Sequence, residues 1–205
     1  AANETNAIIL DTRMPERFAK GFVPNSINIG IDGSFAPWVG TLITDIKQPI
    51  LIVADEDRAE EVVTRLARVG YDYCIGYLQG GFEAWKAEGK EIDTIQSINA
   101  ATFYNESLNE QISIVDVRKK SEFDSEQIIG AENVPLDFIN QNIASINKNK
   151  KYYVHCAGGY RSMIFISILK ARGYHNLIDV KGGFKAIKAT NKFTLSNYVC
   201  PSTML

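Results

Sequence analysis

The sequence predicts an α/β protein made of two copies of one unit, each a mainly parallel sheet flanked by helices. Two observations lead to this class. First, a set of motifs recurs at displacements of 102 to 105 residues, a period too long for a solenoid repeat and suited to a small domain. Second, short apolar runs alternate with helical patterns within each copy. This β-α-β alternation favours parallel strands with helices on both faces, and ligands at the carboxyl ends of the strands.

The repeat is carried by short motifs that occur in the same order in both copies. An Asp-x-Arg stretch ends with Arg13 in the first copy and with Arg118 in the second, 105 residues later. A Gly-Gly-Phe turn ends with Phe82 and again with Phe184, 102 residues later. We therefore expect two domains, residues 1–94 and 95–205.

The elements follow from the apolar periodicity within each copy. In the first copy, runs rich in β-branched or aromatic residues predict strands at 8–10, 50–54 and 74–77. Apolar residues at helical spacing predict a helix at 60–69 that ends on Gly70. The second copy repeats the pattern, with strands at 112–115, 152–155 and 177–180 and a helix at 162–172.

Composition excludes several classes of protein. Of the 205 residues, 45% are hydrophobic and 22% are charged, so neither a disordered nor a fibrous protein is expected. A net charge of -2 gives no bulk attraction to nucleic acid or to an anionic membrane. No apolar run approaches the roughly 18 residues that span a bilayer, and the first residues lack the pattern of a secretion signal. We therefore expect a cytoplasmic protein and, because the sequence begins without methionine, a piece of a longer chain.

The stretch HCAGGYRS, residues 155–162, holds the strongest chemical signal. Cys156 ends a predicted strand, two glycines follow, and Ser162 begins a predicted helix. Because glycine can adopt left-handed conformations, the loop can curl back and bring its N–H groups and the positive helix start around the sulfur. Such donors favour thiolate over thiol and would hold a persulfide or the sulfonate part of a sulfur donor. Arg161 is expected to add a fixed positive charge.

The two other cysteines have simpler interpretations. Cys74 lies within a predicted strand and is expected to pack there. Cys200 is interpreted as a packed or exposed thiol, with the alternative that it is a resolving partner for Cys156. Three cysteines without metal-ligand spacing predict neither a zinc site nor a disulfide framework, and no cofactor is expected.

Groups near the predicted site are expected to support it rather than to react. Asp116 and Arg118, at the end of a strand, are expected to form an internal salt bridge or a loop clamp. The Gly-Gly-Phe turn that ends with Phe184 is expected to pack a helix, with phosphate binding as an alternative. His155 should point to the opposite face of its strand from Cys156, so no neighbouring base is expected.

Several motifs together resemble the rhodanese family of sulfurtransferases, over the whole chain as two tandem domains. They are the Asp-x-Arg motif, a later Asn-Val-Pro, CAGGYRS, Ala-Arg-Gly-Tyr and Lys-Gly-Gly-Phe. The resemblance implies a five-stranded parallel sheet in each domain, with Cys156 as the sulfur-carrying nucleophile and the loop after it as the cradle for that sulfur. The second copy departs from the family pattern at Gln127, where many members have histidine.

The first copy resembles more narrowly the C-terminal half of proteins that fuse a metallo-β-lactamase-like persulfide dioxygenase to two rhodanese domains. The residues that carry this likeness are Phe35 to Gly40 and Gly80 to Trp85. It implies a fused or associated partner domain of that kind, whose iron ligands would lie outside the present sequence.

The expected reaction is a double displacement with a small sulfur donor and a thiol acceptor. The Cys156 thiolate takes a sulfane sulfur from thiosulfate or a low-molecular-weight persulfide and then yields it to the acceptor. Four residues separate Cys156 from Arg161, whereas phosphate-handling cysteine enzymes of related architecture have five, so the smaller ring suits sulfur. The alternatives are a non-catalytic sulfur-sensing or interaction module, and a cysteine phosphatase or arsenate reductase. The predicted substrate-binding residues are Ala157, Gly158, Gly159, Tyr160, Arg161 and Ser162.

The first copy is expected to be an inactive scaffold. Asp55 is aligned with Cys156 at a displacement of 101 residues, and the loop from it to Arg58 is shorter than the loop from Cys156 to Arg161. Acidic residues at 55–57 would place negative charge where a bound persulfide would lie. The first domain is therefore predicted to lack both the cysteine and a loop of full length.

Overall fold

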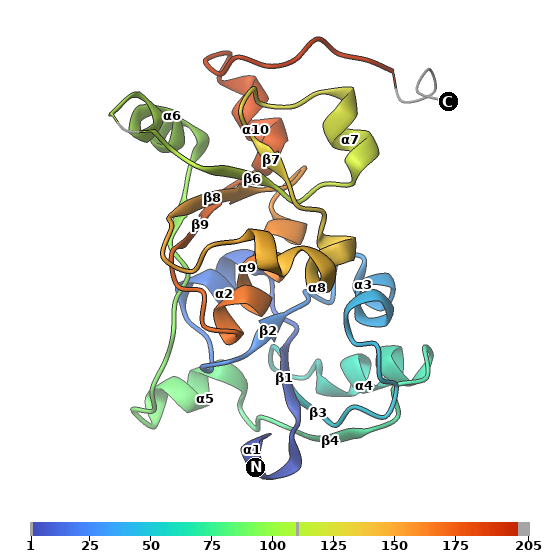
Figure 1. Ribbon diagram of the computed structural model, residues 1–205. Helices are drawn as coiled ribbons and strands as arrows, with labels where there is room; N and C mark the ends of the chain where they lie inside the picture. The colour runs from blue at the N-terminus through green and yellow to red at the C-terminus, as the bar shows by residue number, and fades with distance from the viewer. Residues whose placement is uncertain (1, 110, 201–205) are drawn as a thin grey trace. The chain divides into compact units, whose positions relative to one another are not determined.

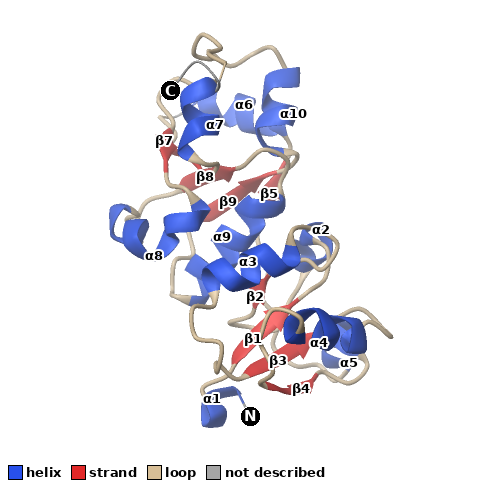
Figure 2. Ribbon diagram, turned by 90° about the vertical axis from the view of Figure 1, so that its right-hand side faces the viewer, coloured by secondary structure: helices blue, strands red, loops and turns tan. Residues whose placement is uncertain are grey.

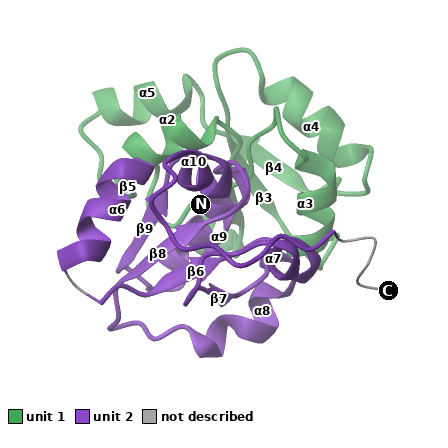
Figure 3. Cartoon of the chain, turned by 90° about the horizontal axis from the view of Figure 1, so that it is seen from above, with its two compact units in different colours: residues 1–95 green, residues 96–205 purple. Residues whose placement is uncertain are grey.

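The computed structural model describes residues 2–109 and 111–200. The chain divides into two compact units, residues 1–95 and 96–205, which Figure 3 shows in two colours. This division falls one residue after the predicted boundary. Each unit has one sheet whose strand pairs are parallel, so the predicted α/β class with two tandem copies is confirmed.

The sheet of the first unit has the strand order β2-β1-β3-β4 (Figure 1). Its strands are β1 (Ile8–Asp11), β2 (Ile27–Asn28), β3 (Ile50–Val53) and β4 (Cys74–Tyr77). The helices are α1 (Ala2–Thr5), α2 (Pro15–Lys20), α3 (Phe35–Leu42), α4 (Ala59–Ala67) and α5 (Gly81–Ala87). Helices α2 and α5 lie over one face of the sheet, and α3 and α4 lie over the other (Figure 3).

The sheet of the second unit has five strands in the order β5-β9-β8-β6-β7. These are β5 (Ser97–Ile98), β6 (Ile114–Asp116), β7 (Glu132–Asn133), β8 (Tyr152–His155) and β9 (Leu177–Val180). The helices are α6 (Ala100–Asn109), α7 (Lys120–Ser125), α8 (Ile139–Asn142), α9 (Tyr160–Ala171) and α10 (Gly183–Ala189), with short 3-10 turns η1 (Leu136–Phe138) and η2 (Ile143–Ser145) beside α8. Helices α6, α7 and α10 lie over one face, and α8 and α9 lie over the other (Figure 2).

The prediction of five strands is therefore wrong for the first unit, over the residues that the structure describes. In the second unit, β5 supplies the fifth strand by pairing with β9. No described segment pairs with the corresponding outer edge of β4. Ile75 and Tyr77 of that edge strand are 42% and 61% exposed.

The turn after β8 connects a strand and a helix that are both buried in the core of the second unit. All four residues of β8 are buried, and so are residues 162–169 of α9. A helix that is apolar on all sides belongs in the interior of a domain, and the run from Met163 to Leu169 has this character. Helix α9 begins at Tyr160, two residues before the predicted start. Within the described ranges, no helix is both long and apolar enough to cross a membrane.

Candidate functional site

Cys156 is the first residue after β8, the middle strand of its sheet. Its backbone therefore lies at the carboxyl end of parallel strands, where ligands bind in open α/β sheets. The other predicted loop residues follow in order. Ala157 and Gly158 form the turn, Gly159 is the N-cap of α9, and Tyr160, Arg161 and Ser162 make up the first turn of that helix.

The sulfur of Cys156 accepts a hydrogen bond from its own loop. The backbone N–H of Gly159 donates to Sγ over 3.1 Å. Gly159 has a φ of 105°, a left-handed conformation that residues with a Cβ rarely adopt. Gly158 has no positive φ, so only one of the two glycines is used in this way. Cys156 is 1% exposed, so the bond forms in the protein interior. A hydrogen bond is electrostatically stronger there than in bulk water.

The start of α10 holds the backbone of the same loop. The N–H of Phe184 donates to the Cys156 carbonyl over 2.7 Å, and the N–H of Lys185 donates to the Ala157 carbonyl over 3.1 Å. Gly183 has a φ of 56°, and a Cβ there would lie 2.3 Å from the Cys156 carbonyl oxygen. A residue larger than glycine would thus push the loop away. The Gly-Gly-Phe turn, which is predicted to pack a helix, also positions the candidate nucleophile.

The predicted site residue Ser162 belongs to a buried polar network beside the sulfur, and its other members were not predicted from the sequence. The Ser162 hydroxyl oxygen lies 3.8 Å from Sγ and donates to Oδ1 of Asp179 over 2.8 Å. Asp179 also accepts a hydrogen bond from the Ser97 hydroxyl over 2.6 Å. Ser162 and Asp179 are both buried, so the carboxylate fixes the orientation of the hydroxyl next to the sulfur. A single Asp inside the otherwise apolar strand Leu177–Val180 was the available signal.

Arg161, which is expected to add a fixed positive charge, is paired with a carboxylate. Its Nη1 and Nη2 donate to Oε2 and Oε1 of Glu122, in α7, over 2.5 and 2.8 Å. Glu122 raises the pKa of Arg161, and Arg161 holds the pKa of Glu122 below its usual range, in both cases chiefly through these hydrogen bonds. Glu122 lies 39 residues before Arg161 in the chain, so no local pattern linked the two.

Asp116 and Arg118 form the predicted internal salt bridge. The Nη2 of Arg118 lies 2.6 Å from Oδ2 of Asp116, and both residues are buried. Arg118 also donates to the Glu126 carbonyl over 2.8 Å and lies over the ring of Phe184, 4.0 Å from its centroid. The Asn133 amide donates to the carbonyls of Asp116 and Arg118. These contacts clamp the segment after β6, and they occupy the arginine inside the fold.

His155 is fully buried in the strand before the cysteine. Burial lowers the pKa of its imidazole, against the smaller opposing effect of Asp116, so the ring is neutral at physiological pH. Its Nε2 lies 3.9 Å from Oδ2 of Asp116 and has no hydrogen-bond partner, and its Nδ1 lies 3.4 Å from the Cys156 carbonyl oxygen. The ring stacks on Phe184 at a centroid distance of 6.1 Å.

The two units can be aligned through the clamp that they share. In the first unit, Arg13 pairs with Asp11 over 2.6 Å, and the Asn28 amide donates to the carbonyls of both. Asp11 is in register with Val53, just as its counterpart in the second unit is in register with His155. The residue after Val53 is Ala54, so Ala54 takes the place of the cysteine.

The alignment of Asp55 with Cys156 is therefore wrong by one residue. The turn glycines agree with this correction, because a Cβ on Gly81 would approach the Ala54 carbonyl oxygen to 2.9 Å, as one on Gly183 would approach that of Cys156. The predicted shortening of the loop is also wrong. Residues 54–58 separate β3 from α4, whereas residues 156–159 separate β8 from α9. The earlier count used arginine positions, and Arg58 precedes its helix whereas Arg161 lies inside one.

The two units carry the same link between helix and loop with opposite charges. In the first unit, Arg17 of α2 pairs with Asp55 of the loop after β3 over 2.5 Å. In the second unit, the helix supplies Glu122 and the segment after β8 supplies Arg161. In the first unit the carboxylate of this pair therefore lies in the loop, and the arginine of that loop, Arg58, is paired elsewhere, with Asp32 and Glu61.

The remaining cysteines differ from Cys156 in their surroundings. Cys74 begins β4 and is half-buried. Burial, and to a lesser extent the charge of Asp72, raises the pKa of its thiol, which disfavours the nucleophilic thiolate. Cys200 is exposed near the end of the described chain. Among the residues at 2–109 and 111–200, no group of three or more His, Cys, Asp or Glu side chains is arranged to hold a metal ion.

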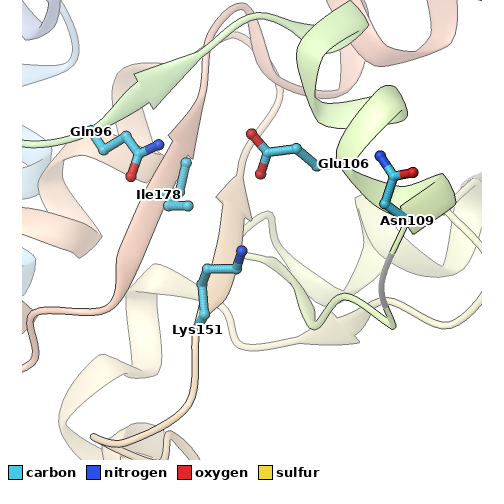
Figure 4. A pocket seen from close by; sticks show the side chains of 5 residues that line it. All are labelled: Gln96, Glu106, Asn109, Lys151 and Ile178. Atoms are coloured by element: carbon cyan, nitrogen blue, oxygen red, sulfur yellow. The ribbon is translucent and has the colours of Figure 1, made fainter.

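A cavity of about 430 Å³ in the second unit lies away from this site (Figure 4). Lys151, which lines it, directly precedes β8, so the cavity is at the opposite end of that strand from Cys156. The Tyr153 hydroxyl donates to Glu106, another lining residue. None of the predicted site residues lines this cavity.

Comparisons with known proteins place this geometry in context. The model of a family described as Rhodanese-like domain matches residues 1–88 and 99–190. YqhL of Bacillus subtilis, an uncharacterized protein, is 35% identical over 72 residues, which are 35% of this chain and 57% of YqhL. A protein of Allochromatium vinosum named as a sulfurtransferase is 27% identical over 77 residues, which are 38% of this chain and 72% of that protein.

Among solved structures, a rhodanese-like domain protein from Staphylococcus aureus is 37% identical. The match covers 45% of this chain and 91% of that one, with a TM-score of 0.43. The chain spans about half the length of the first curated relatives that it matches.

Proposed function

Because the chain belongs to the rhodanese-like domain family, we propose that its second unit is a sulfurtransferase with Cys156 as the nucleophile. The donor is a small molecule with a sulfane sulfur, either thiosulfate or a low-molecular-weight persulfide, and the acceptor is a thiol. The distant relatives include a protein named as a sulfurtransferase. The likeness of the first copy to fusions with a persulfide dioxygenase supports persulfides as part of the donor class.

The reaction proceeds in two displacements. In the first, the Cys156 thiolate attacks the outer sulfur of the donor, a new S–S bond forms, and the donor leaves as sulfite or as a thiolate. In the second, the acceptor thiolate attacks the outer sulfur of the Cys156 persulfide, and the Cys156 thiolate is regenerated. The sulfur atom moves without a net change of electrons, so no external oxidant or reductant is needed.

The observation that carries this proposal is the hydrogen bond from the Gly159 N–H to Sγ of Cys156. A backbone donor aimed at a sulfur in the turn before a helix N-terminus favours the anionic forms of that sulfur. Both the thiolate and the persulfide that replaces it are anions.

Exposure to thiosulfate or to a persulfide, followed by intact mass measurement, tests the proposal. The wild-type protein is expected to gain one sulfur atom, and Cys156→Ser is expected to gain none and to lose transfer to a thiol. Cys74→Ser serves as the matched control and should take up sulfur like the wild type. Equal loss in both variants would contradict the assignment of Cys156, and an unchanged wild-type mass with every donor would favour a non-catalytic module.

A further inference from the structure

Arg161, in the first turn of the helix that follows the candidate loop, forms an ion pair with Glu122 of α7. Both terminal nitrogens of the guanidinium donate to the carboxylate, over 2.5 and 2.8 Å. The side chains are only 17% and 35% exposed, so bulk water screens the pair incompletely. The positive charge of Arg161, which follows the loop by two residues, is thereby matched by a negative one.

This pairing affects sulfur donors of different charge unequally. Thiosulfate carries two negative charges, and the persulfide of an uncharged thiol carries one. A dianion gains more than a monoanion from an uncompensated guanidinium, and it also loses more when a carboxylate occupies that guanidinium. A site built in this way favours the donor with the smaller charge.

We propose that Glu122 is a specificity-determining residue that selects monoanionic persulfides over thiosulfate by occupying Arg161. This inference rests on the proposed function, because it names the donor class for the same sulfur. Glu122 acts through Arg161 and does not itself touch the sulfur, so its role is that of a positioning residue.

The first unit indicates that this arrangement is more than a structural link. There, Arg17 and Asp55 join the same helix and loop with the charges exchanged, so the link does not require a cation on the loop side. In the second unit, which has the cysteine, the cation of the pair is Arg161 at the start of α9, and helix α7 supplies the carboxylate that balances it. The pair with glutamate on the helix and arginine after the strand thus occurs in the unit that has the candidate nucleophile.

Glu122→Gln is the sharpest test, because it removes the charge and keeps the shape. Glu122 also accepts a hydrogen bond from the Lys119 N–H at the start of α7, and glutamine can fill that capping role. The readout is the single-turnover rate at which Cys156 gains sulfur, from thiosulfate and from the persulfide of 2-mercaptoethanol. The ratio of the two rates cancels any general change in the reactivity of the thiolate.

In Glu122→Gln, the rate with thiosulfate relative to persulfide is expected to rise about tenfold, because Arg161 is then uncompensated. The gain should shrink at high ionic strength. The double variant Glu122→Gln with Arg161→Gln also lacks the ion pair but leaves no positive charge, so its ratio should return toward the wild-type value. Asp124→Asn, on the same helix and paired with Lys120 over 2.7 Å, is the matched control and should leave the ratio unchanged.

The outcomes separate this inference from the proposed function. An unchanged ratio in a folded Glu122→Gln protein would overturn the role of Glu122, while sulfur uptake at Cys156 would still stand. A rise of equal size in the double variant would show that loss of the link, and not charge, alters the ratio, which also overturns it. If neither donor loads the wild-type cysteine, the proposed function fails, and the inference fails with it.

Discussion

At the scale of single residues, the acidic side chains around Cys156 are each held by a partner. Asp116 is paired with Arg118, Glu122 with Arg161, and Asp179 accepts hydrogen bonds from two serines. Buried charges are tolerated when they are paired and hydrogen-bonded. Because these carboxylates are paired or hydrogen-bonded, several of them can lie near a site that is proposed to carry an anionic sulfur.

His155 gives this part of the protein a dependence on pH. Burial lowers its pKa in the folded state, whereas the unfolded chain should show the ordinary value of about 6.5. Folding thus favours the neutral ring, so this contribution to stability is fully present above about pH 6.5 and is lost as the pH falls through the lowered pKa. The free energy of unfolding of the wild type should decrease over this range, and that of His155→Leu should decrease less.

Urea unfolding at a series of pH values measures this difference. His175→Leu, the same substitution at an exposed histidine, is the control variant. Parallel curves for the wild type and His155→Leu would contradict the assignment of the pH dependence to His155.

At the scale of elements, the two units share a strand, a turn and a helix but differ in what the turn presents. In the second unit, the turn places Gly159 so that its N–H meets a sulfur. In the first, the corresponding strand is followed by Ala54 and then by acidic residues, and the positive φ belongs to Asp57. The fold therefore determines where the residue after the strand lies, and the turn determines which N–H groups can donate to its side chain.

A graft separates these two contributions. In a Cys156→Ser background, Ala54→Cys should fail to take up sulfur, because the turn at 54–58 lacks glycine and acidic residues lie beside the new thiol. Replacing residues 54–61 with the seven residues found at 156–162 should restore measurable uptake from a persulfide. Mass measurement after exposure to the donor reports both results. Equal uptake by the two variants would show that the fold alone activates the cysteine.

At the scale of the whole molecule, the residues of the candidate site all come from one unit. Cys156, Glu122 and Asp179 lie within residues 96–205. This unit has its own five-stranded sheet and a buried cluster that includes Phe103, Tyr153 and others. A domain with a core of this kind can fold by itself.

The fragment 96–205 is accordingly expected to fold and to gain one sulfur atom at Cys156. Circular dichroism during urea unfolding should show one cooperative transition, as small single domains do, and intact mass should report the sulfur. The fragment 1–95, which lacks the site cysteine, is the control and should gain none. A folded fragment 96–205 that takes up no sulfur, where the full chain does, would assign a necessary role to the first unit.

Much of the molecule was predictable from the sequence because it depends on local patterns. Apolar runs gave the strands at 74–77, 152–155 and 177–180 with their observed ends. The repeated motifs indicated two copies, and CAGGYRS indicated a cysteine in a turn before a helix. Aligning Asp55 with Cys156 places the register of the first copy one residue off, whereas strand pairing and the 102-residue displacement of the Gly-Gly-Phe turn both align Ala54 with Cys156.

The sequence by itself determined the α/β class, the tandem repeat and the candidate nucleophile, since each depends on patterns of residues that are close together in the chain. Only the tertiary structure decided which distant side chains surround that nucleophile. Glu122 of α7 contacts Arg161, and Asp179 of β9 contacts Ser162, because parallel pairing and helix packing bring these elements to one end of the sheet. Their contacts depend on the meeting of elements far apart in the chain, and no local pattern of residues encodes such a meeting.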